Sequence, residues 1–344
     1  MLALRRIIGP AAVVLVLAGL TFGATALDQG KGRQPRPPLS DQNFTVPGGN
    51  GQLLTALADG GVGVVRRGEK FGQATLERID GASAPVQLPE LDFSLTTHAV
   101  TAGRTLWINR SGDFISVEGE AASLVTPNDG WSDKAGHWIS GFSVSGDTVV
   151  YTRNEVPRLF RMNATSGRVT TSDLSTAPEA AGSFAVAVDS GGYTYLAAAE
   201  SRDLGVTVLA PDGEVTRIEG IKVSQFSSDS DGRVLMPTGY SCGAFLAGKE
   251  VAETPLQTHP TMCVARATST VGWNEEGGRV EIWDGQSTAV ISPKQGQGVV
   301  FNPLGRPVPV TTFAKPRDVF VDPSGNAWIL DVQGAAVTER LRTP

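Results

Sequence analysis

The sequence has little charge and no excess of basic residues. Only 19% of its 344 residues are charged, and 29 Lys and Arg stand against 35 Asp and Glu, which gives a net charge of −6. A nucleic-acid-binding domain normally carries a basic patch or stripe, so no nucleic-acid partner is expected. No Gly-X-Y period and no convincing helical periodicity follow residue 30, which excludes collagen, coiled coils and helical bundles. Phosphate-binding glycine loops and dinucleotide fingerprints are also absent, so we expect no cofactor and no bound metal.

The N-terminus has the pattern of an export signal. Arg5 and Arg6 precede an uncharged run, residues 7–27, that is 21 residues long and therefore able to span a bilayer. The run ends in Ala24-Thr25-Ala26, an A-x-A site that favours cleavage after Ala26. Residues 1–27 are thus either a retained single-pass anchor or a cleaved signal peptide. Both outcomes place the rest of the chain outside the cytoplasm, at the cell membrane or secreted.

Residues 28–42 contain almost nothing apolar and include Pro35, Pro37 and Pro38. Proline-rich segments of this kind are stiff and extended, so the stretch is predicted to be a spacer between the membrane and a globular domain, residues 43–344.

The two cysteines, Cys242 and Cys263, fit an exported protein. Outside the cytoplasm two thiols tend to form a disulfide, and neither residue belongs to a C-x-x-C pair or a zinc-site spacing. We predict a Cys242–Cys263 bridge; the alternative is two unpaired buried thiols.

An internal repeat is the main observation of the sequence. An apolar strand, a polar glycine turn and a second strand recur, and the turn glycines are separated by 43, 43, 45, 41 and 93 residues: Gly60, Gly103, Gly146, Gly191, Gly232 and Gly325. A degenerate copy, Val264–Trp273, lies inside the last interval. Each glycine is predicted to sit in a tight turn that needs positive φ.

A period of 40–45 residues with several short strands is typical of a β-propeller blade. The fold class predicted is therefore all-β, a propeller of about seven blades, with six or eight also compatible; a β-sandwich or tandem Ig-like domains are the alternative. The last repeat is one outer strand short, and Asn43–Val46 can supply that strand and close the ring.

The last repeat, Lys315–Asp331, resembles the repeat of NHL-type propellers and of the streptogramin-lyase-like (virginiamycin B lyase) family. The resemblance implies a propeller and suggests metal-dependent lyase or hydrolase activity as an alternative function. In that family a catalytic His follows the proline of the repeat, whereas Arg317 and Asp318 follow Pro316 here. No catalytic residue is therefore carried over. The N-terminal part also resembles that of anchored actinobacterial propeller proteins with fibronectin-type repeats.

Candidate binding residues lie at or just before predicted innermost strands, which surround the channel mouth of a propeller. They are His98, His137, Trp138, His259, Arg317 and Asp318, joined by the loop residue Trp131. Trp131 and Trp138 flank His137 in a non-repeating loop, where they form either a ligand platform or packing between blades.

Two further motifs are better explained as turns than as functional sites. Gly239–Gly243 fits the G-x-S-x-G nucleophile elbow but lacks a following helix, which favours a hairpin bend. Asp229–Arg233 and Asp322–Asn326 resemble fragments of calcium loops, yet Asp and Asn are ordinary turn residues. The sequence thus favours a membrane-tethered propeller that binds an extracytoplasmic protein or carbohydrate; a metal-dependent lyase or hydrolase is the alternative, so enzymatic activity stays open.

Overall fold

A computed structural model of the chain divides into two compact units, Met1–Pro37 and Pro38–Pro344. The structure describes residues 43–46, 51–59, 61–78, 83–91, 98–198, 205–223, 226–229 and 231–255, and after these only the strands given below. The predicted anchor (1–27) and spacer (28–42) lie outside the described residues. Within the described ranges no helix is long and apolar enough to cross a membrane.

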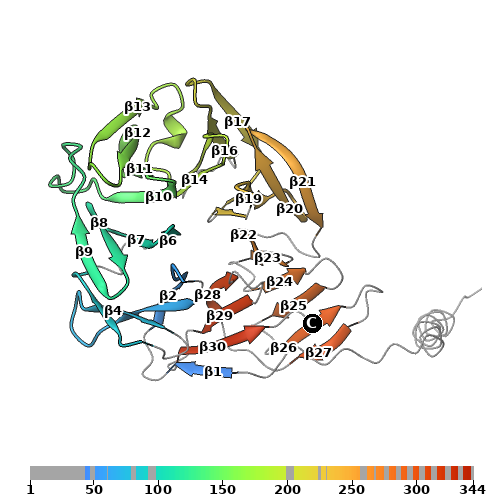
Figure 1. Ribbon diagram of the computed structural model, residues 1–344. Helices are drawn as coiled ribbons and strands as arrows, with labels where there is room; N and C mark the ends of the chain where they lie inside the picture. The colour runs from blue at the N-terminus through green and yellow to red at the C-terminus, as the bar shows by residue number, and fades with distance from the viewer. Residues whose placement is uncertain are drawn as a thin grey trace, which may run out of the picture. The chain divides into compact units, whose positions relative to one another are not determined.

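The described strands form seven antiparallel sheets, numbered I to VII here (Figure 1). Sheet I contains β2 (Gly51–Ala56), β3 (Val62–Arg67), β4 (Ala74–Arg78) and β5 (Val86–Leu88). Sheet II contains β6 (Ala99–Ala102), β7 (Thr105–Arg110), β8 (Asp113–Glu118) and β9 (Ala121–Val125). Sheet III contains β10 (Ile139–Ser145), β11 (Thr148–Arg153), β12 (Val156–Asn163) and β13 (Val169–Asp173).

A 3-10 turn, Pro178–Ala180, precedes sheet IV. Sheet IV contains β14 (Ala185–Val188), β15 (Thr194–Ala197), β16 (Gly205–Leu209) and β17 (Val215–Glu219). Sheet V contains β18 (Ser227–Ser228), β19 (Val234–Pro237), β20 (Ser241–Leu246) and β21 (Lys249–Pro255). Sheet VI contains β22 (Met262–Arg266), β23 (Ser269–Asn274), β24 (Arg279–Trp283), β25 (Thr288–Ser292), β26 (Gln297–Phe301) and β27 (Pro307–Val310). Sheet VII contains β28 (Pro316–Val321), β29 (Ala327–Asp331), β30 (Ala336–Leu341) and β1 (Asn43–Val46).

The predicted repeat corresponds to the first two strands of each sheet. The turns between these strands have positive φ at Gly103 (57°), Gly146 (55°) and Gly232 (72°), as predicted. In sheet IV the positive φ is at Gly192 (83°), so the prediction of Gly191 was wrong by one residue. Asp189 explains the shift, because its Oδ1 accepts hydrogen bonds from the N–H groups of both Gly191 and Tyr193 and sets the turn.

The apolar core lies between the sheets. Alternate residues of one strand point to opposite neighbours: in β7, Leu106 and Ile108 pack with sheet I, whereas Trp107 packs with sheet III. Similar clusters join sheets III and IV, IV and V, and V and VI. The first strands of neighbouring sheets also contact one another, including β2 with β6, β6 with β10, and β10 with β14. Because β28 contacts β2, the series of sheets closes on itself.

The closing strand is β1. It pairs antiparallel with β30, from Asn43 opposite Glu339 to Val46 opposite Ala336, and is the outermost strand of sheet VII. The predicted closure by both ends of the domain is therefore confirmed. Sheet VI departs from the repeat, because β26 and β27 extend it to six strands.

The predicted disulfide is also confirmed. Cys242 in β20 is bonded to Cys263 in β22, and their Cα atoms lie 5.7 Å apart. Both residues are buried in the apolar cluster between sheets V and VI.

Candidate functional site

The connection from β9 to β10, residues 126–138, carries three of the predicted site residues: Trp131, His137 and Trp138. It joins sheets II and III, and it has no strand or helix of its own. We call it the 126–138 loop. Its conformation is set by contacts with the end of β11 and with the β7–β8 turn.

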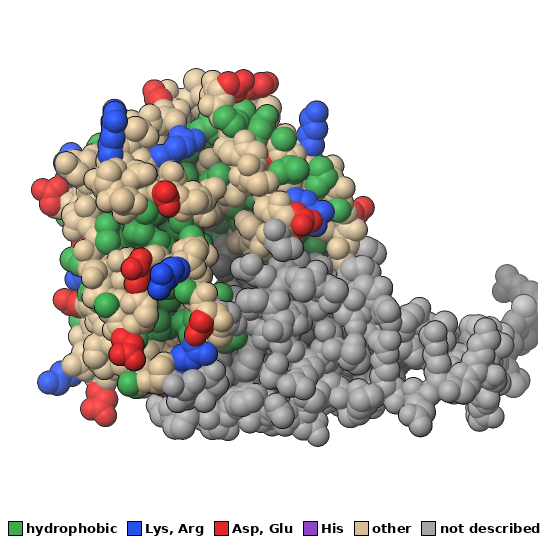
Figure 2. Space-filling view, viewed as in Figure 1, with side chains coloured by type: hydrophobic (Ala, Val, Ile, Leu, Met, Phe, Trp, Pro, Cys, Tyr) green, Lys and Arg blue, Asp and Glu red, His purple; other side chains and the backbone are tan. Residues whose placement is uncertain are grey.

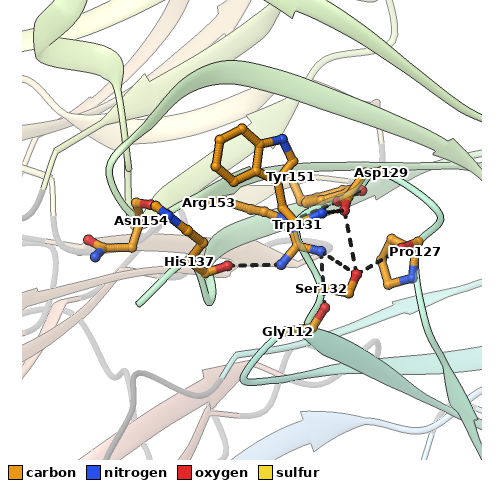
Figure 3. Close-up of polar contacts among 9 residues, drawn as sticks. All are labelled: Gly112, Pro127, Asp129, Trp131, Ser132, His137, Tyr151, Arg153 and Asn154. Atoms are coloured by element: carbon orange, nitrogen blue, oxygen red, sulfur yellow. Dashed lines mark hydrogen bonds and ion pairs between the residues drawn. The ribbon is translucent and has the colours of Figure 1, made fainter. Parts of the chain in front are cut away.

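Arg153, the last residue of β11, anchors the loop (Figure 3). Its Nε donates to Asp129 Oδ2 at 2.7 Å, and neither side chain of this ion pair is exposed. The terminal nitrogens donate to the backbone oxygen of His137 (2.9 Å), to Ser132 Oγ (2.9 Å) and to the backbone oxygen of Gly112 (3.0 Å). One buried guanidinium therefore binds the start, middle and end of the loop.

The Asp129 carboxylate is equally well bound. Its Oδ2 also accepts the Tyr151 hydroxyl at 2.7 Å, and its Oδ1 accepts the backbone N–H of Trp131 at 2.9 Å. Burial, and then the hydrogen bond to Asp129, raise the pKa of Tyr151 far above its usual value. Tyr151 therefore remains a hydrogen-bond donor at all physiological pH values. Buried charges are tolerated when their hydrogen-bonding capacity is filled in this way.

His137 is held in one orientation. Its Nδ1 lies 3.1 Å from the backbone oxygen of Asn154. A carbonyl only accepts hydrogen bonds, so Nδ1 carries the proton and Nε2 of the neutral ring is an acceptor. Asn154 is itself bound to the loop, through its N–H to the Trp138 oxygen and its Nδ2 to the Gly136 oxygen, both at 2.9 Å.

Trp131 lies beside His137. The two rings meet edge to face, with centroids 4.8 Å apart, and the ammonium nitrogen of Lys134 lies 4.0 Å from the centroid of the indole ring. Trp131 is half-buried and packs against the cluster between sheets II and III that contains Trp107 and Phe114. Packing between sheets, one of the two alternatives for Trp131, is therefore confirmed, and the ligand platform stays a prediction.

His98 lies just before β6 and is connected to the same region through Asn109. The Asn109 Oδ1 accepts the His98 N–H at 2.6 Å, and Asn109 Nδ2 donates to the Ile139 oxygen at 3.2 Å. This buried amide thus joins the starts of β6 and β10. The Nε2 of His98 is buried without a hydrogen-bond partner among the described residues, and burial lowers the pKa of His98 to about 4.

Two other predicted site residues lie in sheet VII. Arg317 and Asp318 lie in β28, where a register shift between Pro316 and Asp318 marks a β-bulge at Arg317. His259 lies outside the described residues.

The G-x-S-x-G motif and the calcium-loop fragment Asp229–Arg233 both form turns in the structure. Ser241 begins β20, and the Thr238 N–H donates to its carbonyl, so Gly239–Gly243 is a strand–turn–strand segment and not a nucleophile elbow. The Asp229 carboxylate accepts two turn N–H groups and the Arg233 Nε, which explains its presence without calcium. Within the described ranges no group of three or more His, Cys, Asp or Glu residues could hold a metal ion.

Sequence reasoning missed Arg153, Asp129 and Asn109. A usable signal was present for Arg153, because it lies two residues after the apolar run Val149-Val150-Tyr151 in one strand and carries a charge that must be paired if it is buried. Nothing local identified its partner, since Asp129 lies 24 residues earlier in a polar loop.

No family model and no curated protein matches the chain. Several solved structures match the chain in fold. A streptogramin B lyase superposes with a TM-score of 0.59 at 9% identity, over 87% of this chain and 97% of that chain. Virginiamycin B lyase from Staphylococcus aureus gives 0.57 at 11% identity, over 89% and 98%. The extracellular domain of a hybrid two-component system from B. thetaiotaomicron gives 0.54 at 12% identity, over 88% of this chain and 42% of that one.

At these identities the likeness concerns the fold alone. It confirms an all-β propeller similar to the streptogramin-lyase propellers, as the resemblance of the last repeat implied. The resemblance to anchored actinobacterial surface proteins stays a prediction.

Proposed function

We propose that this β-propeller is an extracytoplasmic binding scaffold, tethered to the membrane by residues 1–27 and held away from it by the spacer 28–42. The binding surface is the end of the propeller that carries the 126–138 loop, together with the predicted residues at the starts of innermost strands. The tether is supported by the sequence pattern, and the disulfide fits an oxidising compartment.

The observation that carries the proposal is the complete burial of the Arg153–Asp129 pair beneath a surface loop. Removing two charges from water is costly, and an apolar pair of similar volume would often stabilise the fold as well. Here the two charges instead hold a loop in one conformation. Binding sites are commonly built from such loops on rigid scaffolds.

The residues around His137 favour ligand binding over catalysis. The described residues bring His137, Trp131 and Lys134 together, but they place no carboxylate beside His137 that would complete a general acid–base pair. Burial lowers the pKa of His98, so its ring is neutral at physiological pH, and its Nε2 is buried.

Two measurements test the proposal. In intact cells, external protease should digest the propeller, and the mass of the mature chain shows whether cleavage after Ala26 has occurred. Complete protection from protease would contradict the extracytoplasmic location.

The second measurement is capture of surface ligands by the full chain. Replacing His98, His137 and His259 together by Ala should weaken capture moderately, and EDTA should leave it unchanged. A turnover that EDTA and a single His replacement both abolish would show an enzyme instead.

A further inference from the structure

The indole of Trp131 is a partly exposed aromatic surface, and the side chain of Lys134 covers one of its faces through a weak contact. Trp131 is half-buried and packs against the apolar cluster between sheets II and III. One face carries the ammonium of Lys134 at 4.0 Å. Lys134 is exposed, and a solvent-exposed cation–π contact is weak, so this side chain can leave the ring without disturbing the fold.

Polar groups of defined direction surround the ring. The His137 imidazole lies edge to face with the indole, and its Nδ1–H is held by the Asn154 oxygen. The acceptor Nε2 is therefore set beside Trp131 in one orientation. Histidines that bind ligands or metals are commonly oriented by such a bond from the other ring nitrogen to a backbone carbonyl.

The set of groups is fixed before any ligand arrives. Arg153 binds the oxygen of His137 and the hydroxyl of Ser132, and Asp129 binds the N–H of Trp131. Figure 3 shows the indole standing clear of these polar contacts, which lie beneath it. A rigid site of this kind loses little conformational entropy on binding, so even a small ligand can be held.

We propose that Trp131 is the platform of a carbohydrate-binding site. The C–H face of a pyranose ring stacks on the indole in place of the Lys134 ammonium, since the negative face of the aromatic ring attracts polarised C–H groups. His137 Nε2 accepts a hydrogen bond from a sugar hydroxyl, and the displaced ammonium donates to a second oxygen. The inference rests on the proposed function and specifies its ligand class.

A sugar fits these observations better than a protein partner. Protein interfaces need roughly 1,000 Å² or more and a cluster of apolar anchors. Among the described residues, the large hydrophobic side chains with most exposure do not form one cluster but are spread over sheets I, II and V: Phe71, Leu124, Tyr240 and Val251. On the face shown in Figure 2, acidic and basic side chains are scattered singly among polar and apolar ones. A single ring flanked by one acceptor and one mobile cation suits one or two sugar units.

The test is a calorimetric titration of the full chain in a detergent without a sugar head group. The probes are chitotetraose, cellotetraose and tri-galacturonate. At least one should give a saturable change, and Trp131→Ala should weaken its binding at least ten-fold. The control is Phe71→Ala, which removes an aromatic residue that is more exposed than Trp131, in the turn between β3 and β4, and should leave binding unchanged. Lys134→Met should weaken tri-galacturonate more than the neutral probes, because only the acidic sugar pairs with the ammonium.

The absence of a saturable response to all three probes, or equal binding by the Trp131→Ala and unsubstituted chains, overturns the carbohydrate site. Capture of a surface protein that requires Trp131 but no sugar would also overturn it, while the proposed scaffold function would stand. Conversely, protection of the propeller from external protease would remove the proposed function, whatever the titration shows.

Discussion

Arg153 Nε and Asp129 Oδ2 lie 2.7 Å apart, and neither side chain has any exposed area. The pair joins the end of a central strand of sheet III to a loop that begins in sheet II. Because its hydrogen bonds are filled by backbone and hydroxyl groups on all sides, it holds the 126–138 loop in the conformation that presents Trp131 and His137.

Breaking this pair should be strongly destabilising. Arg153→Met leaves the Asp129 charge buried without its partner, and the loss should be about 3–5 kcal/mol in the free energy of unfolding measured in urea. Asp231→Asn is the matched control, because Asp231 pairs with Arg233 at the surface and should cost less than about 1 kcal/mol. Similar losses for the two variants would show that the buried pair contributes little.

The disulfide should form in the exported protein and stabilise the contact between sheets V and VI. Without reduction, mass spectrometry should find Cys242 and Cys263 in one linked peptide. Replacing both by Ala should lower the free energy of unfolding by about 3 kcal/mol, as the loop-entropy model predicts for a closed loop of this size. Alkylation of either thiol in the unreduced folded protein would contradict the bridge.

Closure by β1 should be essential to the domain. A chain that starts at Gly51 lacks the four residues that pair with β30, so the outer edge of sheet VII is exposed and the melting temperature should fall markedly. A chain that starts at Gln42 keeps the strand and serves as the control. Equal melting temperatures would mean that β1 adds nothing to the closed ring.

The pH dependence of stability should contain a contribution from His98. Its pKa is about 4 in the folded protein, below the ordinary histidine value of 6.5, because burial disfavours the charged ring. The unfolded chain therefore binds the proton first, and stability is lost as the pH falls from about 6.5 towards 4. At pH 4.5 the loss should be about 2 kcal/mol relative to pH 7. His98→Gln should remove that part of the difference between urea titrations at the two pH values; an unchanged difference would place the His98 pKa near its ordinary value.

Much of the fold followed from local patterns. Glycine turns at a period near 43 residues predicted the inner strand pairs, and the missing outer strand of the last repeat predicted the pairing of Asn43–Val46 with β30. The disulfide followed from two cysteines placed in neighbouring repeats. The extension of sheet VI by β26 and β27 was not predicted, because that segment carries no turn glycine in the repeat pattern.

The candidate site was predicted only in part. Trp131 and His137 were identified because aromatic and titratable residues are unusual in a polar, non-repeating loop, and the structure brings their rings together. Their joint support by Arg153 was not visible, since an arginine at the end of an apolar strand does not reveal which distant carboxylate it meets.

The sequence by itself therefore determined the architecture: short strands and glycine turns have a local periodicity, and a chain that repeats one unit has to pack each copy against the next. Only the tertiary structure decided how the 126–138 loop is held. The contact of Arg153 with Asp129 joins sheet III to the loop that follows sheet II, and the contact of Asn109 with Ile139 joins sheets II and III. Their geometry depends on how neighbouring sheets pack, and no local pattern encodes that relationship.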